Sequence, residues 1–193
     1  MEPPAEGGSD RSRRLELLLP AGAFLALYAL LGVPFFLQRG FEADLLVLSL
    51  LLGCFLAALS AIDLNEFRLP DVLTLPLMVV GLIATPLLLG ASVWWQAASA
   101  AIGFALLAGA AVIYARLRGE AGLGLGDAKL LAASGAWLGA EALPSVLLWA
   151  CGSAIIGLCI RGWRGGSLSR KSRVPFGPFL AFGTWLVWLY GPL

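Results

Sequence analysis

Seven apolar segments separated by short polar stretches take up most of this sequence and limit what the chain can fold into. They cover residues 17–37, 43–62, 72–91, 93–115, 127–140, 142–160 and 175–191. A helix that spans a bilayer needs about 20 mainly apolar residues, and most of these segments come near that length. Because 60% of the residues are apolar and only 13% are charged, a water-soluble domain of this size could not bury them. We predict an all-α membrane protein, a polytopic helical bundle of about seven transmembrane helices, one of them short.

The short segment is 127–140, and the placement of the basic residues favours counting it as a span. If the N-terminus is cytoplasmic and all segments cross, 12 of the 13 Lys and Arg residues lie on the cytoplasmic side, and only Arg39 lies outside. That distribution fits the positive-inside rule. If 127–140 did not cross, the basic loop 161–173 would move outside and the split of the 13 would be 7 to 6. We therefore predict a cytoplasmic N-terminus and an outer C-terminus.

Residues 1–16 are polar and read as a disordered cytoplasmic tail. The first apolar segment follows basic residues, as a signal peptide would, but its apolar run is too long and no small-x-small cleavage site follows. We interpret residues 17–42 as a retained N-terminal transmembrane helix with an outer turn.

Several chemistries are excluded by residues that the chain lacks. It has no histidine, which rules out a Ser-His-Asp triad, a Cys-His pair and a His-ligated zinc site. Cys54, Cys151 and Cys159 lie in apolar runs without a CxxC pair, so we expect buried apolar fillers, with neither a disulfide nor a metal. The net charge of +1 gives no nucleic-acid footprint. No cofactor is expected.

Two acidic residues stand out on the predicted cytoplasmic side. Asp63 ends the second predicted helix, where the partial negative charge of the helix C-terminus disfavours a carboxylate, so its position suggests a function. Asp127 opens the fifth helix, where an acid is also an ordinary cap. The preceding glycines, Gly122, Gly124 and Gly126, favour a recessed, wet cavity instead. By contrast, we interpret Asp71 as the N-cap of the third helix.

Two carboxyl groups at one membrane face can act as an aspartic-protease pair that shares one proton. One acid then activates a water and the other polarises the scissile carbonyl, with no need for metal or histidine. Lys129 could balance the charge of such a pair, contact a lipid phosphate, or reach toward the interface.

The segment Pro175-Phe-Gly177-Pro178-Phe precedes the last helix. It is either a loop that starts a helix with a proline in its first turn, or exposed backbone at the cavity wall that hydrogen-bonds an extended substrate.

Three segments together carry a family likeness over residues 43–191. Asp63-Leu-Asn-Glu-Phe-Arg-Leu-Pro70-Asp71-Val-Leu-Thr74 resembles the first active-site segment of the type IV prepilin peptidases. Gly124-Leu-Gly126-Asp127-Ala-Lys129-Leu-Leu resembles their GxGD segment, and Val174-Pro175-Phe-Gly177-Pro178-Phe-Leu resembles the stretch before their last helix.

The resemblance implies a membrane aspartic endopeptidase that removes the basic leader of prepilins or pseudopilins at the cytoplasmic face, usually after a glycine. It implies Asp63 and Asp127 as the catalytic residues. It also implies a set that shapes the site or binds substrate, namely Gly124, Gly126, Lys129, Pro175, Gly177 and Pro178. Residues 43–193 would be the catalytic domain. The CxxC-containing methyltransferase domain of many members is not found here, so we expect a short form without N-methyltransferase activity.

Two other functions stay open. An intramembrane GxGD protease of the presenilin or signal-peptide-peptidase kind would cut helices, although the position of Asp63 at a helix end rather than mid-span favours the first interpretation. A non-enzymatic transport or assembly subunit could use the acids to relay ions. The expected partners are prepilin-like substrates and membrane lipids, in the plasma membrane of a bacterium. The sequence leaves the oligomeric state open.

Overall fold

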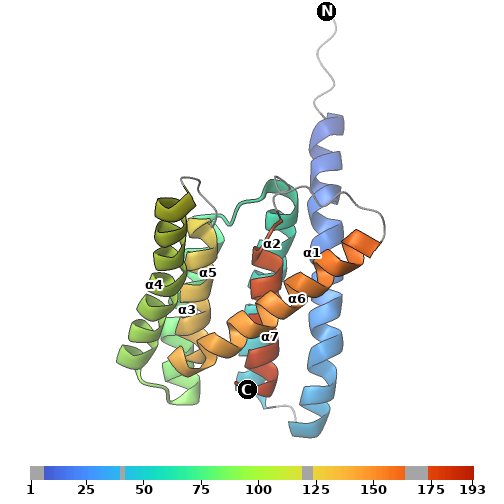
Figure 1. Ribbon diagram of the computed structural model, residues 1–193. Helices are drawn as coiled ribbons and strands as arrows, with labels where there is room; N and C mark the ends of the chain where they lie inside the picture. The colour runs from blue at the N-terminus through green and yellow to red at the C-terminus, as the bar shows by residue number, and fades with distance from the viewer. Residues whose placement is uncertain (1–6, 40–41, 119–123, 164–173) are drawn as a thin grey trace, which may run out of the picture.

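The computed structural model describes residues 7–39, 42–118, 124–163 and 174–193. Gly122 and most of the basic loop 161–173 lie outside these ranges. The described residues form seven α-helices and one 3-10 turn, without a strand (Figure 1). The bounds are α1 Gly7–Arg39, α2 Ala43–Glu66, α3 Asp71–Leu89, α4 Val93–Arg118, α5 Leu125–Leu138, η1 Ala140–Ala142, α6 Leu143–Trp163 and α7 Gly177–Tyr190.

The helices confirm an all-α membrane protein. Five of them are long and apolar enough to cross a membrane, the last including the η1 turn. Successive helices alternate in direction, so α1, α3, α5 and α7 all begin on the upper side of Figure 1, and α6 runs obliquely across the bundle. The site segments at the end of α2 and at the starts of α5 and α7 therefore share one end of the molecule.

Some helix lengths differ from those expected. Helix α1 begins at Gly7, so the prediction of a disordered tail is wrong for residues 7–16, because extending an existing helix costs far less than nucleating one. Helix α5 is short, as predicted, but α7 is also only 14 residues long. A proline-containing segment precedes α7 and Gly191, with φ of 84°, terminates it.

Helix α2 continues one turn beyond its predicted end. It stops at Glu66 because Phe67 adopts a left-handed conformation with φ of 52° and donates its N–H to the carbonyl of Asp63. Asp63 is therefore three residues before the end of the helix, about 4.5 Å along the axis at 1.5 Å per residue. The acid sits in the last turn rather than at the terminus.

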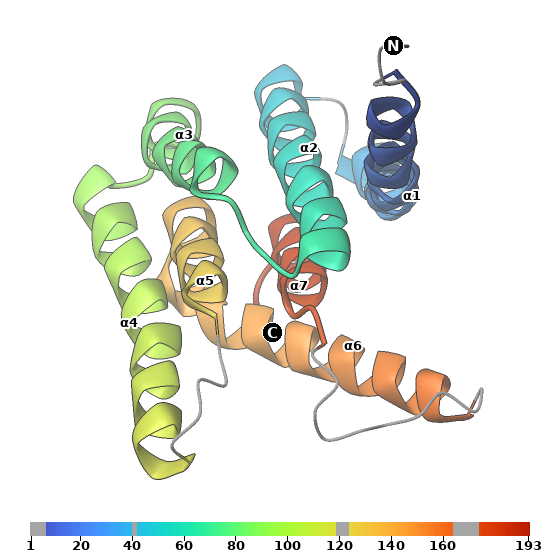
Figure 2. The same ribbon diagram turned by 90° about the horizontal axis from the view of Figure 1, so that it is seen from above.

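The helices pack as two units. Helix α5 packs most extensively on α4 and α3, whereas α7 packs on α6 and α2, and α1 covers α2. Figure 2 shows α3, α4 and α5 on one side and α1, α2 and α7 on the other. The units meet mainly where α5 contacts α7 and where α2 contacts α3. We call this contact the seam. Asp63 and Asp127 lie on opposite sides of it.

Close backbone contact embeds the short helix α5 in its unit. A Cβ atom built on Gly103 of α4 would lie 2.6 Å from the carbonyl oxygen of Leu131, and one on Gly135 of α5 would overlap the carbonyl oxygen of Ser99. Glycines at such places let two helices approach closely. On the other face of α5, Trp137 donates its indole N–H to the carbonyl of Leu77 at 2.8 Å.

The second unit is held by aromatic side chains of α7. Trp185 donates to the carbonyl of Tyr28 on α1 at 3.1 Å, and Trp188 donates to the hydroxyl of Ser49 on α2 at 2.8 Å. The three cysteines, Cys54, Cys151 and Cys159, are exposed. The prediction that they are buried fillers is wrong, because apolar residues in a membrane protein can face lipid as well as core.

We expect Gly135→Ala to lower the free energy of unfolding by about 1–3 kcal/mol, as overpacking typically does, because its Cβ has no room against Ser99. Gly109→Ala in α4 is the matched control, since a Cβ there meets nothing within 4 Å. Unfolding in mixed detergent micelles measures both. Equal stability of the two variants would contradict the close α4–α5 packing.

Candidate active site

Asp63 is held by the segment that begins the last helix. Its side chain is buried, and its Oδ2 atom accepts a hydrogen bond from the backbone N–H of Gly177 at 3.0 Å. A Cβ atom on Gly177 would lie 2.7 Å from the same oxygen. Position 177 therefore needs glycine for a close approach of backbone to carboxylate, although its backbone angles are ordinary.

Asp127 lies on the opposite side of the seam from Asp63. It is the third residue of α5 and is half-buried, and its carboxyl group accepts a backbone hydrogen bond from Gly124. The segments that carry the two acids adjoin, because Leu69 packs against both Gly126, next to Asp127, and Gly177, which binds Asp63. The structure thus brings together two acids that are separated by 64 positions in the sequence (127 − 63).

Leu69 lies beside both acids' segments, although no pattern in the sequence distinguishes it from other apolar residues. The built Cβ of Gly126 would lie 2.9 Å from Leu69 Cβ, and that of Gly177 would lie 3.2 Å from Leu69 Cδ2. The side chain therefore fits between the two glycine segments that hold the acids. Side chains at both glycines would displace Leu69, so Gly126 and Gly177 have a shared packing role.

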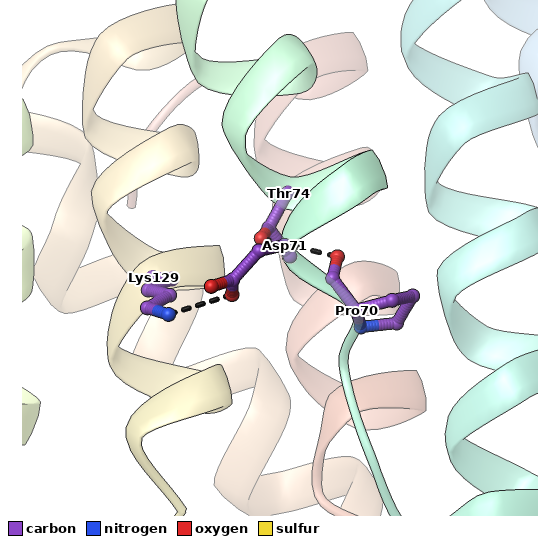
Figure 3. Close-up of polar contacts among 4 residues, drawn as sticks. All are labelled: Pro70, Asp71, Thr74 and Lys129. Atoms are coloured by element: carbon purple, nitrogen blue, oxygen red, sulfur yellow. Dashed lines mark hydrogen bonds and ion pairs between the residues drawn. The ribbon is translucent and has the colours of Figure 1, made fainter.

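Lys129 does not balance the acid pair. Its Nζ atom forms an ion pair of 2.6 Å with Asp71 at the start of α3 (Figure 3). Two residues along a helix correspond to a rotation of about 200°, so Lys129 and Asp127 project from nearly opposite faces of α5. The ion pair instead ties α5 to α3 within one unit.

Asp71 is not the N-cap of α3, as the sequence suggested. The cap is Pro70, and Asp71 is the first helical residue, without a capping hydrogen bond. The hydroxyl of Thr74 donates back to the carbonyl of Pro70 at 3.3 Å (Figure 3). The carboxylate at position 71 is free to pair with Lys129 because the proline has already fixed the turn.

Of the two interpretations of 175–179, the structure has the loop that starts a helix. Pro175 lies before α7, and Pro178 is in its first turn, where a missing N–H costs nothing. The N–H of Gly177 points to Asp63 rather than toward an open cavity. Gly177 and Pro178 are both buried, and Gly177 is the one that contacts Asp63.

A metal centre has no set of ligands in the part of the chain that the structure describes. No group of three or more His, Cys, Asp or Glu side chains there could hold an ion.

The fold and the acid pair define a class, the polytopic α-helical membrane proteins in which two carboxyl groups from separate helices meet at one end of the bundle. Comparison with known families specifies the assignment, because residues 50–160 match the Type IV leader peptidase family. The chain belongs to this family.

Curated relatives agree. The chain is 39% identical over 153 residues to a prepilin leader peptidase/N-methyltransferase of Xanthomonas campestris, covering 74% of this chain and 50% of that protein. It is 46% identical over 129 residues to the protein of that name from Burkholderia pseudomallei, covering 66% of this chain and 41% of the relative. A Pseudomonas aeruginosa relative is 39% identical over 143 residues, covering 74% and 49%.

The chain spans about half the length of these curated relatives. No solved structure matches it significantly. The bacterial relatives and the apolar helices establish a multi-pass bacterial membrane protein.

The Lys129–Asp71 pair should contribute little to stability, because its side chains are 32% and 55% exposed. We expect a coupling energy below about 1 kcal/mol, falling with added salt. The measurement is a double-mutant cycle of Lys129→Gln and Asp71→Asn by unfolding in detergent. A coupling energy well above that value and insensitive to salt would show that the pair is buried in the folded protein.

Proposed function

We propose that this chain is a membrane aspartic endopeptidase whose catalytic residues are Asp63 and Asp127. The observation that carries the proposal is the packing that joins the two acid-bearing segments. Leu69 contacts both Gly177, whose N–H binds Asp63, and Gly126, which directly precedes Asp127. Their neighbours fit that role, because Gly177 and Gly124 each give a backbone hydrogen bond to one carboxyl group and so orient it.

The pair works with one proton between two carboxyl groups. Oδ2 of Asp63 accepts from Gly177, so Oδ1 is the atom available to carry a proton or to face substrate. One carboxylate takes a proton from water as the water oxygen attacks the scissile carbonyl carbon, and the other acid protonates the carbonyl oxygen.

The resulting diol then collapses. The C–N bond breaks, the acid that took the water proton gives it to the leaving amine, and the diol returns its proton to the other carboxylate. The products are a carboxylic acid and an amine, and the pair again holds one proton. This sequence is complete with the two side chains and water.

The substrates that best fit are prepilin or pseudopilin-like precursors, the class named for the relatives. A basic leader followed by an apolar helix places its junction at the membrane interface. Asp63 lies three residues before the end of α2, near the end of its helix rather than in the middle of it. An acid in the middle of a span would suit cleavage inside a helix instead.

The orientation that we propose puts this end of the bundle in the cytoplasm of the bacterium, at the plasma membrane. The start of α1, the end of α2, the start of α3, the end of α4 and the starts of α5 and α7 all lie at it (Figure 1). Arg68 lies between α2 and α3, and Arg116 and Arg118 lie in the last turn of α4, as the positive-inside rule requires.

Replacement of either acid should abolish leader removal. We expect Asp63→Asn and Asp127→Asn each to lower processing at least about 10³-fold. In each variant the one remaining carboxyl group cannot serve as base and as acid in the same step. The measurement is co-expression with a candidate prepilin, followed by mass spectrometry of the product N-terminus. Glu66→Gln, an exposed acid one turn from Asp63, is the matched control and should process normally. Normal processing by either aspartate variant would refute the proposal.

Gly177→Ala should reduce processing without abolishing it. Its methyl group would crowd Asp63 Oδ2 and Leu69, so we expect a loss of about 10- to 100-fold from a displaced carboxylate. Gly152→Ala in α6, where a Cβ meets nothing within 4 Å, should have no effect. An active site that tolerates both changes equally would contradict the role given to Gly177.

A further inference from the structure

We propose that the hydroxyl groups of Ser134 and Thr184 form a positioning contact that sets the register of the seam and thereby the relative placement of Asp63 and Asp127. This inference rests on the proposed function. The two residues are not catalytic, because they lie away from both carboxyl groups and act through the helices that carry them.

One buried polar contact crosses the seam between α5 and α7. The Ser134 Oγ and Thr184 Oγ1 atoms are 2.7 Å apart, and both residues are 1% exposed. Each hydroxyl also lies within hydrogen-bonding distance of the carbonyl four residues earlier in its own helix, Leu130 at 3.0 Å and Leu180 at 2.8 Å. The contact therefore joins two helix backbones through two short side chains with little freedom.

The contact lies at the same distance along the helix from the site on both α5 and α7. Ser134 is seven residues after Asp127 (134 − 127), and Thr184 is seven residues after Gly177 (184 − 177). Helices α5 and α7 begin on the same side of the bundle and run in the same direction (Figure 1). Seven residues correspond to about two turns, or roughly 10.5 Å. If α5 slid along α7, Asp127 would move relative to Gly177 by the full length of that slide.

Other contacts on the seam are less directional. The rings of Trp137 on α5 and Trp188 on α7 meet edge to face at 5.5 Å between centroids. Apolar packing of this kind stabilises contact but restrains sliding weakly, whereas one buried polar pair can fix the register of adjacent helices. Gly177 of α7 in turn binds Asp63 through its N–H. The alignment of α5 with α7 therefore sets the position of Asp127 relative to Asp63.

The chain permits a clean test. Removing one hydroxyl leaves the other bonded to its own helix carbonyl, so Ser134→Ala and Thr184→Val should both fold without an unpaired buried group. Thr184→Ser keeps the hydroxyl. The matched control is Ser99→Ala on α4, since Ser99 is equally buried and bonds the carbonyl of Trp95 at 2.7 Å.

The experiment measures kcat and KM for prepilin cleavage in detergent, with the thermal midpoint of each variant. We expect Ser134→Ala, Thr184→Val and the double variant each to lower kcat about 10-fold, with KM within about 2-fold, because substrate contacts stay and catalytic placement changes. Thr184→Ser and Ser99→Ala should keep kcat near that of the unchanged protein.

The inference is overturned if Ser134→Ala and Thr184→Val keep full kcat, if Thr184→Ser loses as much as Thr184→Val, or if the losses only follow the thermal midpoint. If the double variant loses no more kcat than either single variant, the two hydroxyls act through one shared contact. Losses that multiply in the double variant would indicate two separate effects. Absence of cleavage by the unchanged protein would instead refute the proposed function, so the two failures are distinguishable.

Discussion

The hydrogen bond from the N–H of Gly177 to Asp63 connects parts of the chain that the sequence keeps far apart. It places the start of the last helix against the last turn of α2, at 3.0 Å. Leu69 then fills the space that is left by Gly126 and Gly177. A larger residue at position 177 would separate the carboxylate from its donor, so the placement of the first acid depends on this contact.

The second acid is placed by a different unit. Helix α5 is anchored in α3 and α4 by close backbone contacts and by the indole of Trp137, and it reaches α7 across a smaller seam. Placing the two acids on opposite units makes their separation sensitive to small relative movements. A buried polar contact on the seam restrains such movements at the cost of desolvating two hydroxyls, which their hydrogen bonds offset.

Much of the architecture was predictable, because the bilayer leaves few choices for apolar segments of this length. Hydropathy and charge predict the helices, the short length of α5, and the location of both acids at one end of the bundle. Contacts between distant residues did not follow. Lys129 could have paired with several groups, and nothing local selects Asp71. Leu69 resembles any other apolar loop residue, and the cysteines carried no sign of whether they face lipid or core. The extra turn of α2 depends on one left-handed residue, Phe67.

The central claim is that Asp63 and Asp127 meet at one membrane face. It is tested most directly by Asp63→Cys and Asp127→Cys together, in a chain whose Cys54, Cys151 and Cys159 are replaced by serine. A short bifunctional thiol reagent is added to inside-out and right-side-out vesicles, and linked peptides are found by mass spectrometry. The account predicts a cross-link between positions 63 and 127 that forms readily in inside-out vesicles. Thiols that react singly without linking, or that react from opposite faces, would contradict it.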